Sequence, residues 1–177
     1  MSSSKEFMQN KKTQRNIICL AAAVLLIAAD LLTKRAAVQY LKDRPAVLID
    51  GVLELNYLEN HGAAFGMMEG RGLVFAAAAV FFMAAAVWFL LKTPAEKKYL
   101  PACAVCTAAF AGAAGNLFDR IALGYVRDFI YVSLIDFPVF NVADICVTCS
   151  MAAAFFLILF YYKDGDFQYL SRRKADA

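Results

Sequence analysis

Two aspartates occupy apolar stretches of the chain, and the chemistry open to them depends on whether the fold brings them together. Asp144 ends the stretch FNVAD (140–144), which opens a long apolar run, and Asp128 lies inside YVRDFIYV (125–132). Two carboxylates held together in a partly dry site cannot both ionise easily, so they share one proton. One member can then take a proton from water while the other donates to a carbonyl oxygen. That chemistry hydrolyses an amide with neither a metal nor a covalent intermediate.

Asp144 also has a purely structural interpretation. Asn141 is a good helix N-cap, and Asp144 follows it by three residues, which is the spacing of a capping box. A carboxylate in that position complements the helix dipole and need not react. The two aspartates alone are therefore a weak signal, and the elements that position them decide what they mean.

The composition indicates a membrane protein. Of the 177 residues, 62% are hydrophobic, whereas a soluble domain is nearer to about half. Four apolar runs approach the roughly 20 residues that cross a bilayer as a helix. We therefore predict an all-α membrane protein, a four-transmembrane-helix bundle that forms a single domain over residues 1–177. The predicted spanning helices cover residues 17–33, 73–91, 99–118 and 142–162.

The basic residues predict how the bundle is oriented. Eleven Lys and Arg residues fall on the side of the two termini, and seven fall on the opposite side. Loops rich in Lys and Arg stay in the cytoplasm. We therefore expect both termini inside, the segments around 40–70 and 122–140 outside, and the two aspartates at the extracytoplasmic face.

The outward segments carry short β-prone pieces. AVLIDGVLELNYL (46–58) holds two of them around Asp50 and Gly51, a strong tight-turn signal, and the 125–132 stretch is a third. NHGAAFG (60–66) is typical of a flexible loop whose backbone could approach a ligand, or of a plain re-entry loop before the second helix. The sequence thus predicts a small β-rich extracytoplasmic subdomain.

Polar residues gather at the end of the third run, GAAGNLFDR (112–120). Gly112, Asn116 and Arg120 are four residues apart and share one helix face, with Asp119 close to it. The small residues here let another helix pack closely. The polar residues form either a hydrogen-bonded network at the outer boundary or only a salt bridge at a helix end.

The first run has two interpretations. Asp30 and Lys34 are one helical turn apart and can pair, which favours a helix that continues past them. Residues 1–29 also resemble a secretory signal, with a basic start, an apolar middle and small residues at Ala28 and Ala29. We favour the uncleaved helix, and cleavage would leave the later topology unchanged.

The cysteines and the net charge argue against several other kinds of site. C-x-x-C occurs at 103–106 and 146–149, with Cys19 in addition. Helix rise spreads the four paired sulfurs over about 15 Å of membrane depth, too far for one zinc ion, so we expect no metal and unreactive thiols. The net charge of +3 without a basic stripe argues against nucleic acid. We assign no role to the single histidine, His61.

Taken together, the polar blocks resemble those of the lipoprotein signal peptidase family, also called signal peptidase II. Each block is modest alone, but their combination and order are specific. The similarity extends from the first apolar run to the fourth. The matching blocks are Asp30 with Lys34, NHGAAFG at 60–66, GNLFDR at 115–120, GYVRDF at 124–129 and FNVAD at 140–144.

The resemblance implies which residues form the site. The two catalytic aspartates of the family match Asp128 and Asp144, while Asp119 is left with a structural role. Supporting polar residues of the family, expected to bind substrate or hold the site, match seven positions. These are Asp30, Lys34, Asn60, Gly62, Asn116, Arg120 and Asn141.

The resemblance also implies the reaction. Members of the family remove the signal peptide from bacterial prolipoproteins, just before a diacylglyceryl-modified cysteine, at the outer face of the cytoplasmic (inner) membrane. The sequence is therefore expected to encode an aspartic endopeptidase without a cofactor. Its expected partners are diacylglyceryl prolipoproteins and membrane lipid, and we expect a monomer.

Three other functions fit parts of the sequence. A membrane thiol oxidoreductase would use the cysteine pairs, but these are expected within the bilayer rather than at its surface. A proton-coupled transporter would use ionisable residues reaching toward the midplane, whereas Asp30, Lys34, Arg120, Asp128 and Asp144 gather at one face. A non-catalytic membrane subunit would leave the two aspartates without a task.

Overall fold

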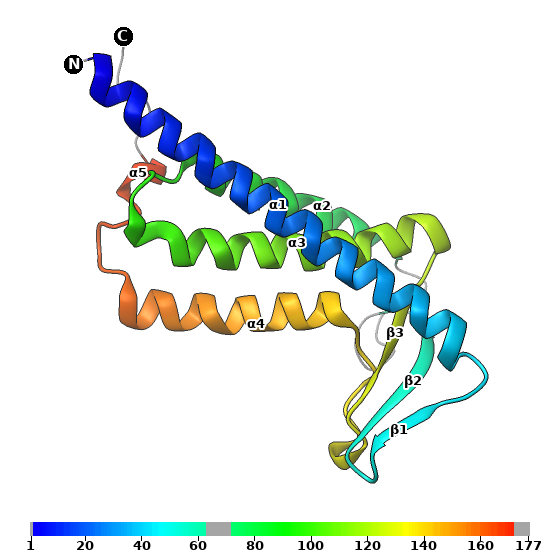
Figure 1. The fold of residues 1–177 in the computed structure, drawn as a ribbon. Coiled ribbons are helices and arrows are strands. Elements are labelled where there is room, and N and C mark those ends of the chain that lie inside the picture. The colour runs from blue at the N-terminus through cyan, green and yellow to red at the C-terminus, as the bar shows by residue number, and fades with distance from the viewer. Residues whose placement is uncertain (1, 63–71, 172–177) are drawn as a thin grey trace.

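The predicted four-helix bundle with a small β subdomain is confirmed by the structure, a computed structural model that describes residues 2–62 and 72–171. Both ends of the chain lie at one end of the bundle, and the sheet lies at the other (Figure 1). Helix α3 is central, because it packs against each of the other three long helices. The helices are α1 (Ser2–Leu41), α2 (Gly72–Lys92), α3 (Leu100–Leu123), α4 (Val142–Phe156), continued by a π-helical turn (Leu157–Tyr161), and the short α5 (Gln168–Ser171).

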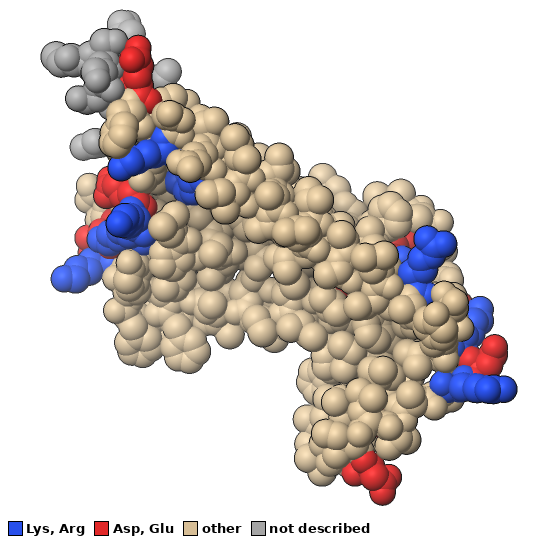
Figure 2. Space-filling view, viewed as in Figure 1, with Lys and Arg blue, Asp and Glu red and all other residues tan. Residues whose placement is uncertain are grey.

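The surface of the bundle fits a lipid environment. In the described part of the chain, four helices are long and apolar enough to cross a membrane. Large apolar side chains such as Leu73, Phe81 and Phe160 point outward. Figure 2 shows the charged residues gathered at the two ends, with a broad uncharged band between them. A soluble bundle would bury such side chains, so this band is the part that lipid covers.

Helix α1 is longer than the sequence predicted, 40 residues rather than the expected span of 17–33. Hydropathy locates only the part of a helix that lies in lipid, and the added ends are polar. The sequence contains no Gly or Pro before Pro45, so nothing interrupts the helix earlier. The helix runs without a break through Ala28 and Ala29, the small residues that also resemble a cleavage site.

The sheet is formed by three short antiparallel strands in the order β1-β2-β3. The turn between β1 and β2 uses Asp50 and Gly51, and Gly51 has a φ of +66° that favours glycine. Both the turn and the three strands appear where the sequence predicted them. The strands are β1 (Ala46–Ile49), β2 (Leu53–Asn60) and β3 (Val126–Tyr131).

The sheet packs on the end of α1, and this contact orients β3. Ala37 and Leu41 of α1 form a buried apolar cluster with Phe129 of β3. Side chains alternate between the two faces of a strand. Phe129 therefore faces the apolar cluster, while its neighbour Asp128 faces the ends of α3 and α4.

Candidate active site

The structure brings the two aspartates to one cavity at the sheet end of the bundle. Asp128 comes from β3 and Asp144 from the first turn of α4, and both line a cavity of about 240 Å³. Asn60, Asn116 and Arg120 line it as well. One wall is the segment 137–140, which leads into α4 and of which the sequence had indicated only Phe140, in the FNVAD block.

Three asparagine side chains hold the two carboxylates. Asn60 Nδ2 donates to Asp128 Oδ2 at 2.8 Å, and Asn141 Nδ2 donates to Asp128 Oδ1 at 2.6 Å. Asn116 Nδ2 donates to Asp144 Oδ1 at 2.7 Å. Asn141 Nδ2 also donates to Asn116 Oδ1 at 3.1 Å, so an amide chain connects the two aspartates. Neither carboxylate forms a salt bridge within the described residues.

The structure confirms the capping interpretation of Asp144. Asn141 Oδ1 accepts from the Asp144 backbone N–H at 3.0 Å, and Asp144 Oδ2 accepts from the Asn141 backbone N–H at 3.1 Å. This reciprocal pair is a capping box. The two roles are compatible, because Oδ2 completes the cap while Oδ1 is on the side of Asn116.

Burial, together with the negative charge of Asp144 nearby, raises the pKa of Asp128 to about 6. The hydrogen bonds from Asn60 and Asn141 oppose this rise, because they stabilise the ionised form. The side chain of Asp128 is almost fully buried. A carboxyl with such a pKa can hold or release a proton near neutral pH, which suits an acid–base catalyst.

Behind the amides lies a second layer of buried charge centred on Lys34. Its Nζ lies 2.8 Å from Asp30 Oδ2, as the four-residue spacing predicted, and 3.4 Å from Asp119 Oδ2. The same nitrogen donates to Asn116 Oδ1 at 2.8 Å. This donation fixes the orientation of the Asn116 amide, so that its NH₂ faces Asp144. The lysine thereby acts on the cavity through Asn116.

Asp30 ties α1 to the start of α4. Its Oδ1 accepts from the backbone N–H of Ala143 at 2.8 Å, so a residue of the first helix caps the last spanning helix. The approach needs glycine, because a Cβ at Gly115 would overlap the Asp30 carboxylate. A Cβ at Gly112 would likewise overlap the carbonyl oxygen of Ala143. The small residues of α3 therefore let three helices meet at the site.

Asp119 has the structural role that the sequence analysis gave it, and its main partner is Arg127. Asp119 Oδ1 lies 2.5 Å from the Arg127 guanidinium, and Asp119 Oδ2 accepts from the Arg127 backbone N–H at 3.0 Å. This contact raises the pKa of Arg127 and fastens the start of β3 to α3. The sequence analysis missed this partner. Gly124 was the sequence feature that could have revealed the contact, because its φ of +82° reverses the chain between Asp119 and Arg127.

Asn60, Gly62 and Arg120 border the entrance of the cavity. Asn60 Oδ1 accepts from the Gly62 backbone N–H at 2.9 Å, so both ends of this amide are occupied. Among the described residues, the Arg120 guanidinium makes only long hydrogen bonds of 3.5 Å, to the carbonyls of Gly62 and Asn116. It also lies 5.4 Å from the centre of the Phe75 ring. The rest of the NHGAAFG loop, 63–66, lies outside the described residues.

The remaining sequence candidates do not join this cavity. His61 is exposed and lies with its ring 5.4 Å from that of Tyr125. The five cysteines are free thiols, and none of them lines the aspartate cavity. Over residues 2–62 and 72–171, no group of three or more His, Cys, Asp or Glu side chains is placed to hold a metal ion.

Comparison with known sequences gives a consistent result. The chain matches the family described as signal peptidase (SPase) II over residues 22–160. It is 36% identical to the lipoprotein signal peptidase of Pseudoalteromonas translucida, over 86% of this chain and 92% of that protein. It is 34% identical to the lipoprotein signal peptidase of Caldicellulosiruptor bescii, over 89% and 97%. The resemblance drawn from the sequence blocks is confirmed.

Solved structures show the same architecture. Two structures of bacterial membrane enzymes superpose on the chain with a TM-score of 0.72 each. One is 25% identical and covers 90% of this chain and 94% of its own. The other is 28% identical and covers 82% and 94%. The helices and the sheet described above are thus arranged as in known enzymes of bacterial membranes.

Proposed function

The chain belongs to the signal peptidase II family, whose members are aspartic peptidases in bacterial membranes, and we propose that Asp128 and Asp144 are its catalytic pair. The reaction is removal of the signal peptide from a diacylglyceryl-modified prolipoprotein, with cleavage just before the lipidated cysteine. One observation carries this proposal: two carboxylates from distant parts of the chain line one cavity and are held by amides rather than by cations.

The proton of the pair resides on Asp128. Burial raises the pKa of this carboxyl to about 6. Asp144 lies at the N-terminus of α4 and interacts with the positive charge of Arg120. Asp144 therefore takes a proton from the attacking water while Asp128 donates its proton to the carbonyl oxygen of the scissile amide. The tetrahedral gem-diol intermediate then collapses: Asp144 returns its proton to the leaving nitrogen, the C–N bond breaks, and Asp128 regains a proton from one of the two hydroxyls.

The other polar residues position the pair or bind substrate. Asn116 and Asn141 orient the carboxylates, and Asn60 holds Asp128 from the β2 side. Arg120 binds a substrate carbonyl or the lipid ester, because most of its guanidinium has no close partner in the described residues. The structure favours Arg120 over Asn60 for this contact, since both ends of the Asn60 amide are already engaged.

We infer that the termini are cytoplasmic and that the aspartate cavity opens at the extracytoplasmic face. The bias of Lys and Arg toward the terminal side supports this orientation. A lipid-bearing substrate would enter sideways from the bilayer, with its scissile bond at the level of the sheet. Charged residues surround that end of the bundle, whereas the band below it is uncharged (Figure 2).

The decisive experiment is an assay of the purified protein on a lipidated prolipoprotein peptide. Asp128→Asn and Asp144→Asn should each abolish cleavage, because they keep the shape of the side chain and remove the titrating group. Asp136→Asn is the matched control, since Asp136 lies on the same side of the membrane, is exposed and does not line the cavity. Cleavage by either cavity variant at the wild-type rate would refute the pair.

Two further arms test the details. Alanine at both Asn60 and Arg120 should impair cleavage of the lipidated substrate, and unchanged cleavage would exclude the substrate-binding assignment. A chelator should not inhibit, because the proposed mechanism passes through two carboxylates and water. Loss of activity under EDTA with intact membrane insertion would overturn that mechanism.

A further inference from the structure

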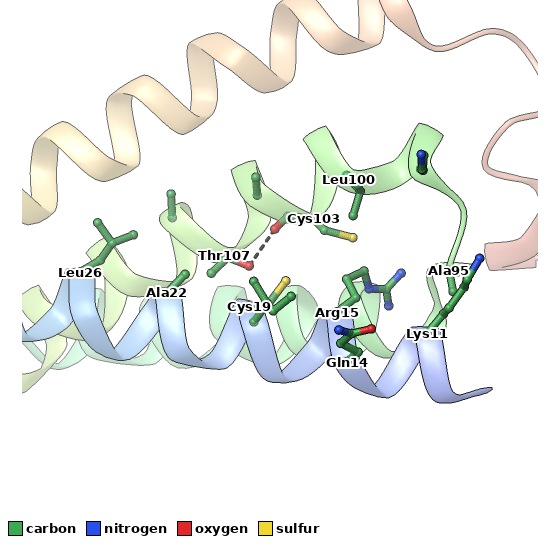
Figure 3. A pocket seen from close by; sticks show the side chains of 14 residues that line it. Lys11, Gln14, Arg15, Cys19, Ala22, Leu26, Ala95, Leu100, Cys103 and Thr107 are labelled. Carbon is green, nitrogen blue, oxygen red and sulfur yellow. Dashed lines mark hydrogen bonds between the residues drawn. The ribbon is translucent and has the colours of Figure 1, made fainter. Parts of the chain in front are cut away.

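A second cavity lies at the opposite end of the bundle, between α1 and α3 (Figure 3). Its volume is about 690 Å³, against about 240 Å³ for the aspartate cavity. Helix α1 lines it on successive turns from Lys11 to Leu26, and α3 lines it from Leu100 to Ala108. None of these residues takes part in the proposed reaction, so this cavity needs its own explanation.

The cavity is polar at one end and apolar along the rest of its length. Lys11, Gln14 and Arg15 gather at the end near Ala95, whereas Ala22 and Leu26 mark the far end (Figure 3). The stretch of α1 from Lys11 to Leu26 is about 22 Å long at the rise of an α-helix. That length equals one leaflet of a bilayer, which is roughly half of 40–45 Å with its headgroups. The shape and polarity match a molecule with a charged head and an apolar chain.

The charged side chains that line the polar end of the cavity are all positive. The buried guanidinium of Arg15 donates to the carbonyls of Leu90, Thr93 and Pro94 at the end of α2 and to the Asn16 side chain. These partners satisfy its N–H groups, but none is a carboxylate. The exposed Lys97 completes the mouth from the start of the α3 segment.

No Asp or Glu is among the residues that line this cavity. No salt bridge within the described residues involves Lys11, Arg15 or Lys97. Lys11 instead lies over the ring of Phe7, with Nζ 4.4 Å from the ring centre. Lys12 lies close enough to Arg15 for their positive charges to repel each other. An anion at the mouth would therefore be attracted by several positive charges.

We propose that this cavity binds an anionic glycerophospholipid of the membrane. Its phosphate lies between Lys11 and Lys97, and one acyl chain lies along α1 and α3 beside Ala22 and Ala104. The site is separate from the aspartate cavity and does not depend on the proposed catalytic pair. Assignment to the cytoplasmic leaflet rests on the orientation proposed above, and that leaflet carries the negative surface charge that such lipids provide.

The charge of the headgroup is tested by native mass spectrometry of the full chain. The protein is titrated with phosphatidylglycerol and, in parallel, with phosphatidylcholine bearing the same acyl chains. Lys11→Gln combined with Lys97→Gln should weaken phosphatidylglycerol binding roughly 30-fold, since each lysine near an anionic headgroup contributes roughly fivefold. Lys5→Gln combined with Lys163→Gln removes the same charge from the same end of the bundle outside the cavity, and should leave binding unchanged.

The acyl chain is tested by filling the apolar part of the cavity. Ala22→Phe and Ala104→Phe should each reduce retention of phosphatidylglycerol about tenfold or more while the unfolding temperature stays near that of wild type. Glycerol phosphate, which has the headgroup without the chains, should bind far more weakly than the lipid. Equal binding of both lipids, equal binding of glycerol phosphate, no effect of either variant set, or a cavity closed by dimerisation would each overturn the proposal.

Discussion

Two groups of carboxylates lie at the sheet end of the bundle, and they are held in opposite ways. The ion-paired layer consists of Asp30 and Asp119 with Lys34 and Arg127. The second group, the amide-held pair, consists of Asp128 and Asp144, which accept hydrogen bonds from asparagine side chains and from backbone. A cation keeps a neighbouring carboxylate ionised, whereas a neutral amide leaves it able to gain a proton.

The comparison teaches which acids are available for chemistry. Asp128 is as deeply buried as Asp30 and Asp119, so burial alone does not distinguish it from the ion-paired acids. The partner does distinguish them. Lys34 and Asn116 connect the groups, because the lysine orients the amide that faces Asp144. The ion-paired layer is thus a fixed scaffold, and Asp128 of the amide-held pair is the acid whose pKa of about 6 suits proton transfer near neutral pH.

Breaking the ion-paired layer should have the largest effect on stability. Lys34→Met leaves two buried carboxylates without their shared cation, and we expect a loss of about 3–5 kcal/mol. The measurement is denaturant unfolding in detergent. Lys42→Met is the control, because Lys42 pairs with Glu59 at 3.7 Å on the surface and should change stability by less than about 1 kcal/mol. Equal small losses would mean that the layer is not a scaffold.

The pH dependence of catalysis tests whether Asp128 of the amide-held pair carries the catalytic proton. With the pKa of Asp128 at about 6, kcat/KM should fall about tenfold per pH unit well above that value, because the required proton is lost. The assay covers about pH 4 to about pH 8. A rate that rises steadily over this range would assign the proton elsewhere.

The same raised pKa has a consequence for stability with a definite sign. The folded state binds this proton more tightly than the unfolded chain, whose pKa is near the ordinary value of 3.8. The contribution of Asp128 to folding is therefore fully present below about pH 4 and is lost as the pH rises through about 6. Asp128→Asn should remove this part of the pH dependence in an unfolding titration.

Asn141 belongs to the helix cap and to the amide-held pair, and two substitutions separate these roles. Asn141→Ala should cost about 1 kcal/mol as a lost cap and raise the pKa of Asp128, because a stabilising donor is gone. Asn141→Ser keeps a capping oxygen but lacks the amide donor. The serine variant should thus be as stable as wild type, while its kcat/KM still begins to fall at a higher pH than that of wild type. If kcat/KM of the serine variant falls at the same pH as that of wild type, the assignment is contradicted.

The smallest effect is expected away from both groups. Replacing all five cysteines by alanine should leave cleavage within about twofold of wild type, because none of them lines the aspartate cavity and the proposed reaction uses no thiol. The assay is the same lipidated peptide, with the unfolding temperature as a check on packing. Loss of cleavage at an unchanged unfolding temperature would favour a thiol oxidoreductase.

The sequence predicted the parts of the fold that local physics decides. Apolar length located the spanning helices, and Asp50–Gly51 located the hairpin. It did not reveal the length of α1, since polar ends that leave the bilayer carry no hydropathy signal. The capping box of Asn141 and Asp144 was predictable because both partners lie within four residues.

Contacts across the chain were harder to predict. The Asp119–Arg127 contact depends on the reversal at Gly124, and the Asn60–Asp128 hydrogen bond depends on the register of β2 and β3. In that register Leu58 lies opposite Asp128, so Asn60 reaches it from the diagonal position. Residue blocks could indicate which side chains gather, but not which atom donates to which.

Asp30 of α1 caps the start of α4, and this contact has a consequence for biosynthesis. The helix that Asp30 caps begins more than a hundred residues later, so it is synthesised long after Asp30. Until then, Lys34, one turn away, is the charged partner that its own helix supplies. The nascent first span thus carries its neutralising charge with it as it enters lipid. The proposed catalytic pair, in turn, is complete only when the final spanning helix brings Asp144, so we expect an incomplete chain in the membrane to be inactive.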